Sequence, residues 1–160
     1  MGYTISIGEA VIDNDIDHKL EYRHCGIGVT GVTIGDAPAF GEPTDYTNSK
    51  WPSYSGWADF AESTGLKDFF YQEEYGVLSS HPGSVPIDDK DLKMVQGKLQ
   101  KYKMQLKGQG KKAIPALWSG DIMEETPPNG GDQNLGRLIW LEYWMRWAIE
   151  NCENPVIANS

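Results

Sequence analysis

The pattern of apolar residues is clearest near the end of the chain, from Asp132 to Cys152. At about 100° per residue, one helical face is aliphatic and the face beside it carries tryptophans. The aliphatic face comprises Leu138, Leu141, Met145, Ala148 and Cys152, and the second face comprises Trp140, Trp144 and Trp147. A helix of this kind must be covered on two sides, so we expect it to be the central element of the domain or part of an oligomer interface.

The limits and the polar stripe of this helix also follow from the pattern. Asp132 comes after a run rich in proline and glycine and is a good N-cap, and Asn154-Pro155 stops the helix after Cys152. Glu142, Arg146 and Glu150 follow one another at intervals of four residues, so each charged side chain can reach the opposite charge one helical turn away.

Two stretches in the first part of the chain have the pattern of strands. Tyr3, Ile5 and Ile7 alternate with small or polar residues, which is the period of a strand with one buried face. The range Gly26 to Ile34 is rich in β-branched residues and predicts one or two short strands that pair with the first. The range Gly35 to Ser53 is rich in proline and small polar residues and predicts a loop.

Two further helices are expected between these regions. Ser53 can cap a helix that Gly65 ends, and the apolar cluster of Leu66, Phe69, Phe70 and Tyr71 follows it. Asp88 can cap a helix closed by Gly108, whose apolar seam matches the aliphatic face of the 132–152 helix, so the two are expected to pack antiparallel. Residues 108 to 131 form a long connection with Trp118, interpreted as a pocket lip or lid.

These elements predict an α+β fold in one domain, residues 1–160. A small N-terminal antiparallel sheet packs with about three helices, and the long C-terminal helix is central. The chain has 160 residues with 39% hydrophobic and 23% charged residues, which is typical of a globular protein. No run is long and apolar enough for a membrane-spanning helix and no leader pattern opens the chain, so we expect a cytoplasmic protein without membrane contact.

The charge is uneven along the chain. The net charge of −9 divides into −9 for residues 1–87, +5 for residues 88–112 and −5 for residues 113–160. An acidic protein with one modest basic segment is a poor general nucleic-acid binder, because backbone binding needs a broad positive footprint. The lysines of the basic segment are interpreted as a solvated face.

The sequence motifs give no positive sign of an enzyme, a cofactor or a metal. The G-x-G-x-x-G pattern from Gly26 to Gly31 precedes residues that favour a strand, whereas a dinucleotide site needs a helix there. The acidic run from Asp13 to Asp17 lacks the later glycine and glutamate of a calcium loop, and the histidines and cysteines lack zinc spacing. Two cysteines, Cys25 and Cys152, are read as free thiols. No catalytic residue is therefore predicted.

The best candidate site combines aromatic planes with small hydrogen-bonding groups, which suits a flat, polar ligand held by stacking and a few fixed bonds. Arginine would add a bidentate grip on a phosphate or carboxylate. The residues predicted to bind the ligand are Asn48, Trp51, Ser53, Tyr54, Ser55, Trp57, His81, Arg146 and Trp147. The alternative is that Trp57 and the three tryptophans of the last helix belong to the core. Glu142, Arg146 and Glu150 then form an internal ion-pair ladder.

The chain also resembles a group of small proteins encoded by tailed bacteriophages, at both of its ends more than from Asp88 to Gly131. The matching residues are Met1-Gly2-Tyr3, Ile5, Ile7-Gly8, Ala10, Asn48, Ser53-Tyr54-Ser55, Trp57, Gly65-Leu66, Asp68-Phe69-Phe70, His81-Pro82-Gly83, Leu138 to Leu141, Trp144 to Ala148, Asn151-Cys152, Pro155, Ile157 and Asn159-Ser160. The resemblance implies a phage origin, a location in the host cytoplasm and, because it reaches both ends, a complete chain. It implies no mechanism.

Three functions remain open from the sequence. The first is a non-enzymatic protein, expected to be a homo-oligomer, that sequesters a small nucleotide-like ligand; a nucleotide-derived immune signal of the host is suggested by analogy with phage counter-defence proteins. The second is an interaction protein that blocks a host protein through its acidic or tryptophan-rich surface. The third is a hydrolase that uses His81 or an acidic pair.

Overall fold

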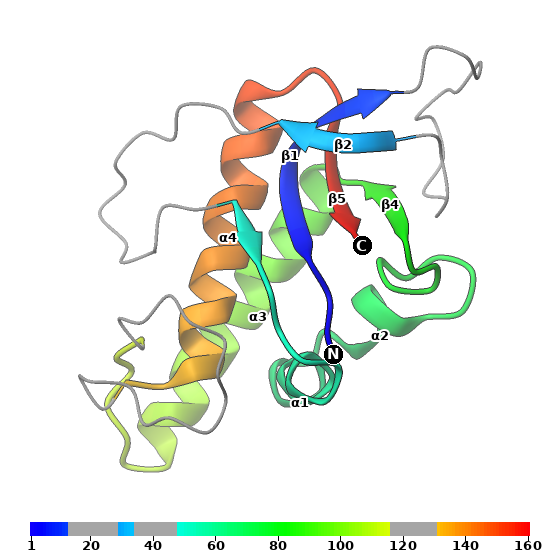
Figure 1. The fold of residues 1–160 in the computed structure, drawn as a ribbon. Coiled ribbons are helices and arrows are strands. Elements are labelled where there is room, and N and C mark those ends of the chain that lie inside the picture. Colours follow the sequence, from blue (N-terminus) through cyan, green and yellow to red (C-terminus); the bar gives the residue numbers. More distant parts are fainter. Residues whose placement is uncertain (13–28, 34–47, 116–130) are drawn as a thin grey trace.

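The fold is an antiparallel sheet with four helices, described for residues 1–12, 29–33, 48–115 and 131–160 of a computed structural model (Figure 1). The strands are β1 (Ile5–Ile12), β2 (Val29–Thr33), β3 (Ser49–Lys50), β4 (Gly83–Pro86) and β5 (Pro155–Asn159). The helices are α1 (Tyr54–Thr64), α2 (Lys67–Tyr71), α3 (Asp89–Gly108) and α4 (Gln133–Asn151). The expected α+β class with a small antiparallel sheet is confirmed.

Strand β1 is the centre of the sheet. It pairs with β2 and β3 on one edge and with β5 on the other, and β4 pairs with β5, all antiparallel. Ile7 lies opposite Ile157 of β5, and the side chains of Ile5 and Ile7 are fully buried. The predicted alternation is confirmed for Ile5 and Ile7, which are buried on either side of partly exposed Ser6, whereas Tyr3 precedes β1 and is only partly buried.

The helix caps follow the sequence signals. The Ser53 hydroxyl accepts a hydrogen bond from the Gly56 amide at the start of α1, and Gly65 ends that helix at φ 75°, a left-handed conformation that glycine tolerates best. Asp88 and Asp91 form a reciprocal capping box at the start of α3. Helix α3 ends at Gly108, as expected, and the left-handed residue Gly110 follows two residues later.

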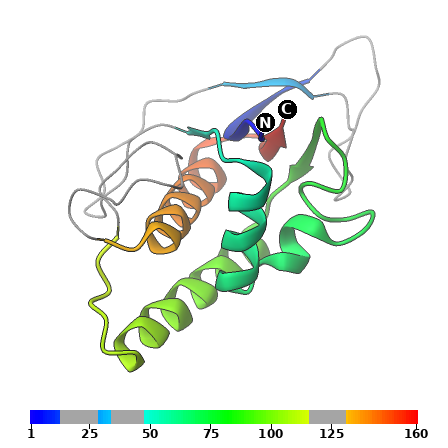
Figure 2. The same ribbon diagram turned by 60° about the horizontal axis from the view of Figure 1, so that its bottom comes forward.

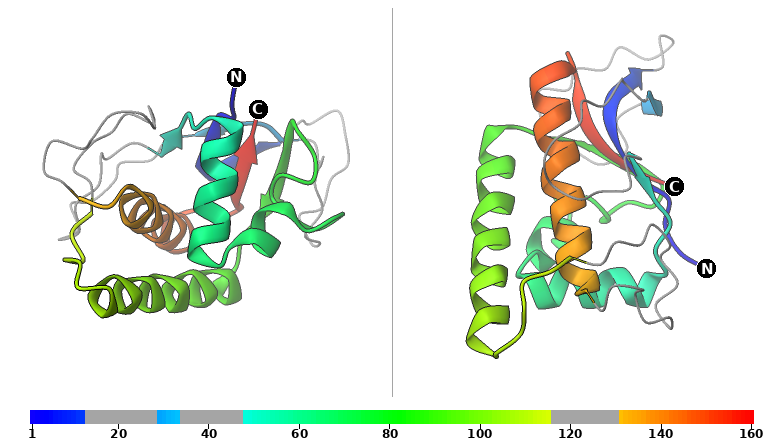
Figure 3. Two further views of the ribbon diagram at one scale, coloured as in Figure 1. Left: turned by 90° about the horizontal axis from the view of Figure 1, so that it is seen from below. Right: turned by 90° about the vertical axis from the view of Figure 1, so that its left-hand side faces the viewer.

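Helix α4 lies between the sheet and α3 (Figure 3, right). Figure 2 shows that α3 and α4 lie side by side and run in opposite directions, as their matching seams predicted. The Tyr102 hydroxyl of α3 donates to Oδ1 of Asp132 at 2.8 Å, and the same carboxylate caps α4 by accepting from the Leu135 amide. One side chain thus begins α4 and joins it to α3.

The tryptophans of α4 belong to the core of a single chain. Trp140, Trp144 and Trp147 are at most 6% exposed, and Trp57 of α1 is fully buried against Phe60 and Phe70. The helix is therefore the central element of the domain, which was one of the two expected arrangements. Because these rings are covered within one chain, they leave no surplus apolar surface to support the expectation of a homo-oligomer.

Several predictions differ from the structure or lie outside its described residues. Strands β3, β4 and β5 and the short helix α2 were not predicted as such, and β3 falls in the stretch that was expected to be a loop. Trp118, Cys25 and the acidic run Asp13 to Asp17 lie outside the described residues. No helix in the described ranges has the length and apolar character needed to cross a membrane.

Truncation of a buried tryptophan should lower the stability of the protein much more than truncation of an exposed one. We expect Trp144→Ala to lower the free energy of unfolding by about 3–5 kcal/mol, because a fully buried ring leaves a cavity. The matched control Trp51→Ala removes a ring that is 60% exposed and should change stability by less than about 0.5 kcal/mol. Urea unfolding followed by circular dichroism measures both values, and equal losses would contradict this division.

Candidate functional site

An exposed cluster of rings lies where the N-terminal segment, the start of α1 and the turn before β4 meet. The rings of Tyr3 and Tyr54 have centroids 4.7 Å apart, and His81 lies 5.1 Å from Tyr3 and 5.8 Å from Tyr54. All three contacts are edge-to-face, an arrangement that holds rings in fixed relative orientations. Tyr54 and His81 are exposed to solvent and Tyr3 is partly buried. We call Tyr3, Tyr54 and His81 the ring cluster.

Backbone contacts hold this region together. The Tyr3 amide donates to the Pro52 carbonyl at 2.9 Å, and Gly2 forms a bridge with Ser53, the N-cap of α1. A β-carbon on Gly2 would stand 2.0 Å from the Pro52 oxygen, so only glycine allows the two segments to approach this closely. The N-terminal segment and α1 are thus fixed side by side, which places Tyr3 next to Tyr54.

Asn159 fixes the hydrogen bonding of His81. The Asn159 side-chain nitrogen points at three carbonyl oxygens, those of Val77, Ser80 and Gly83, at 3.1, 3.0 and 3.4 Å. Because a carbonyl can only accept, this orientation turns Oδ1 of Asn159 toward Nδ1 of His81. Nδ1 must therefore donate, and Nε2 of the neutral ring carries a lone pair.

That lone pair faces a hydroxyl group. Nε2 of His81 lies 3.3 Å from the Tyr54 hydroxyl, which donates to it when the ring is neutral. Asn159 is only 3% exposed, whereas Tyr54 is 38% exposed, so the chain of hydrogen bonds runs from the interior to solvent. At the end of α2, burial raises the pKa of Tyr71, and the neighbouring Tyr3 adds to this effect, so the Tyr71 phenol stays neutral.

The structure divides the predicted ligand-binding residues into several environments. Tyr54 and His81 contact each other, and Trp51 and Ser55 are exposed close to Tyr54 in the sequence. Ser53 is used as a helix cap, and Asn48 is buried, with its side-chain amide donating to the Ile7 carbonyl at 3.0 Å.

Trp57 and Trp147 require a correction as ligand contacts. Both rings are packed in the core of one chain, 0% and 6% exposed, so neither presents a face to a ligand from solvent. The structure therefore agrees with the alternative interpretation of these two residues, in which aromatic rings at helical spacing are packing.

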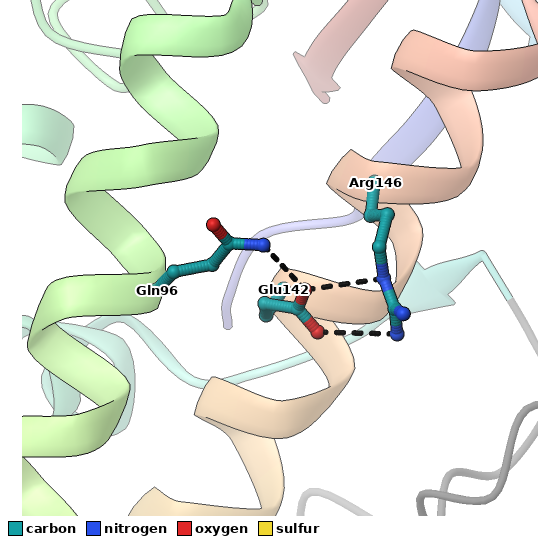
Figure 4. A network of polar contacts seen from close by, with 3 residues as sticks. All are labelled: Gln96, Glu142 and Arg146. Carbon is teal, nitrogen blue, oxygen red and sulfur yellow. Dashed lines mark hydrogen bonds and ion pairs between the residues drawn. The ribbon is translucent and has the colours of Figure 1, made fainter.

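Arg146 is held by a neighbouring carboxylate (Figure 4). Its Nε and one terminal nitrogen lie 3.1 and 3.4 Å from the two oxygens of Glu142, a bidentate pair one helical turn apart. Gln96 of α3 donates to the same carboxylate at 3.2 Å. A ligand anion would have to compete with Glu142 for Arg146.

Arg146 is also distant from the start of α1 along α4. The Arg137 side chain reaches the Gly56 carbonyl of α1 at 3.2 Å, which marks the turn of α4 that lies next to α1. Arg146 is nine residues further on, and at 1.5 Å per residue this is about 13 Å along the helix axis. The structure therefore does not join Arg146 to the ring cluster in one small site.

Other chemistry is limited in the described part of the chain. Burial and, to a smaller extent, the nearby Glu9 carboxylate together raise the pKa of the Cys152 thiol to about 11, so Cys152 is protonated at neutral pH and is a weak nucleophile. Within the described ranges, no group of three or more histidine, cysteine or acidic side chains is arranged to hold a metal ion. Gly31 lies inside β2, opposite Val11 of β1, which excludes the helix that a dinucleotide motif requires.

Comparison with known proteins adds no assignment: no family model, no curated protein and no solved structure matches this chain.

Two members of the site were missed in the sequence. Tyr3 was counted only as a strand residue, and its place beside Tyr54 depends on the Gly2–Ser53 bridge. Asn159 meets His81 across 78 residues of chain, a contact that no local pattern indicates. The one sequence signal available was the presence of polar Asn159 beside apolar residues at the end of β5.

The assigned tautomer of His81 can be measured directly. We expect the neutral ring to carry its proton on Nδ1, because Asn159 accepts from that nitrogen. Long-range ¹H–¹⁵N correlation spectra distinguish the two ring nitrogens. In Asn159→Ala the acceptor is lost, and a substantial population of the Nε2–H form should appear. A wild-type ring protonated on Nε2 would show that the Asn159 contact does not control His81.

Proposed function

We propose that this protein binds a small, flat, polar ligand of the nucleotide class at the ring cluster and acts without catalysing a reaction. The observation that carries the proposal is the edge-to-face packing of Tyr3, Tyr54 and His81 at the surface, backed by the buried Asn159. Sequestration of a nucleotide-derived immune signal in the host cytoplasm is the role we propose from the resemblance to tailed-phage proteins.

The physical case is that of a preorganised stacking surface. An exposed ring that is already fixed by its neighbours loses little conformational entropy when a base stacks on it. The Tyr54 hydroxyl donates to His81 and can still accept a hydrogen bond from a ligand, and Ser55 is exposed one residue away on α1. Exposed Trp51 adds a further ring next to Pro52, whose carbonyl accepts a hydrogen bond from the Tyr3 amide.

Calorimetry against a panel of cyclic nucleotides, cyclic dinucleotides and ADP-ribose derivatives tests the proposal. We expect one member to release heat with a defined stoichiometry, and Tyr54→Ala to weaken its binding by at least about tenfold, since base–aromatic stacking contributes about 1–3 kcal/mol per base. Tyr75→Ala is the matched control, because Tyr75 is an exposed tyrosine in the turn after α2.

Each outcome has a definite meaning. Absence of heat with every member, or equal weakening by Tyr54→Ala and Tyr75→Ala, would overturn a nucleotide site at the ring cluster. A stoichiometric protein retained from host lysate in place of a small ligand would favour the role of blocking a host protein.

A hydrolase is the second candidate, because one arrangement favours it. The hydrogen bonds from Asn159 through His81 to Tyr54 place an oriented base beside a hydroxyl, which is the spatial pattern of an activated nucleophile. In this case Nε2 of His81 takes the proton from the Tyr54 hydroxyl, or from a water molecule in its place, as the oxygen attacks a phosphoryl or acyl centre. The bond to the leaving oxygen then breaks and His81 returns the proton to it, and after attack by Tyr54 a water molecule releases the bound group in the same way.

Recovery of the ligand separates the two candidates. We expect a bound nucleotide to be recovered intact, by chromatography of the denatured complex, from the wild type and from His81→Gln alike. A hydrolase would instead release products from the wild type, and His81→Gln would retain the substrate because the base is lost. Tyr54→Phe keeps the ring for stacking and removes only the hydroxyl, so loss of turnover with retained binding would also indicate a hydrolase.

A further inference from the structure

The lysines of this acidic chain are concentrated in one described segment. Residues 92 to 115 contain seven lysines and no aspartate or glutamate, a local charge of +7. The remainder of the chain therefore carries −9 minus 7, or −16. This separation of charge is sharper than the net charge of +5 for residues 88–112 indicates, because the acidic residues of that range all precede Leu92.

The fold places four of the lysines of α3 on the side that faces away from the core. The buried positions Asp91, Val95, Leu99 and Leu106 define the inner face. On a helical projection at 100° per residue, the exposed lysines fall within an arc of about 120° on the opposite side, where exposed Asp89 at the start of the helix is the one acidic residue. These outer lysines are Lys90, Lys93, Lys101 and Lys107. Half-buried Lys98 and Lys103 lie on the two flanks.

Helix α3 is at the outside of the molecule. Figures 2 and 3 show it at the edge of the fold, with α4 and α1 on its inner side and no described element over its outer side. The Lys98 side chain lies over Gly65 at the C-terminal end of α1, where its positive charge interacts favourably with the helix dipole. The outer lysines are left facing solvent, and we call their surface the α3 outer face.

The middle of the α3 outer face carries small or neutral residues. Gly97 and Gln100 are exposed, and Met104 is 71% exposed. A β-carbon on Gly97 would meet nothing within 4 Å, and its backbone does not have a positive φ. Neither packing nor conformation therefore requires glycine there, although glycine weakens the interior of a helix relative to alanine. Its absent side chain leaves the backbone open to close approach.

We propose that the α3 outer face docks in the major groove of a B-form DNA duplex and binds its phosphate backbone. Lysines are compact point charges that suit phosphate contacts. From Lys90 to Lys107 they extend along about 25 Å of helix, and a helix about 10–12 Å wide fits a groove about 12 Å wide. Gly97 allows close approach at the groove floor, where Gln100 can bond to base edges.

The duplex is favoured over other anionic partners by what the face contains. It has no exposed aromatic ring on which the bases of a single strand could stack. Its one large apolar side chain is Met104, too little for insertion into a lipid surface.

The acidic remainder of the chain does not exclude this contact. Exposed charges are largely screened beyond about 8–10 Å at physiological salt, so the lysines dominate at their own surface. Repulsion from the remainder confines the contact to α3 and keeps it weak, which is consistent with the expectation that the chain is no general nucleic-acid binder.

Fluorescence anisotropy with a labelled duplex of about 20 base pairs tests the proposal. With about four lysine–phosphate contacts, the logarithm of the binding constant should fall against the logarithm of salt concentration with a slope of about −4. Lys101→Gln should reduce the slope by about one and the affinity by about tenfold at about 50 mM salt. Lys67→Gln on α2 is the control with the same charge change at an exposed lysine outside α3.

Gly97→Ala provides a second variant that separates binding from folding. Because alanine favours the helix, Tm should rise by about 3 °C, while the added methyl group at the groove floor lowers duplex affinity. Several results would overturn the proposal: no duplex binding at low salt, equal effects of Lys67→Gln and Lys101→Gln, or tighter binding of single strands or anionic vesicles. Self-association in light scattering that Lys101→Gln abolishes would assign the face to a second copy of the chain.

Discussion

The burial of α4 from two sides is the constraint on which the rest of the described fold depends. Its aliphatic and aromatic faces require cover in different directions, and the sheet and α3 provide it. Burial on this scale also encloses polar side chains, which need partners. Arg137 donates a hydrogen bond to the Gly56 carbonyl of α1. Glu142 accepts one from Gln96 of α3 and pairs with Arg146, so polar side chains of α4 join it to α1 and α3.

Helices α1, α3 and α4 could be predicted because their signals are local. Ser53, Asp88 and Asp132 each cap a helix through an amide three residues away, a distance that the sequence itself displays. The strands β3, β4 and β5 could not be predicted in the same way. They have two to five residues and exist through pairing with distant segments, as when β5 adds to β1 across nearly the whole chain.

The candidate site shows the same limit in a different form. The stretch from Asn48 to Trp57 was contiguous and rich in suitable groups, but neighbouring residues in a strand, a cap and a helix face different surroundings. Asn48 and Trp57 are buried, and the Ser53 side chain caps α1 by accepting a hydrogen bond from a backbone amide. Tyr54 and His81 remained, and their partners Tyr3 and Asn159 came from near the two ends of the chain, where only the folded sheet brings them together.

Strand β4 has a consequence for assembly. Among the described strands it lies at one end of the sheet and pairs only with β5, so its other side could in principle accept a strand from another molecule. It has only four residues, and the last of them, Pro86, has no amide hydrogen to donate. A strand this short offers little template for continuous pairing. Among the described residues, this border of the sheet is therefore a poor site for edge-to-edge aggregation.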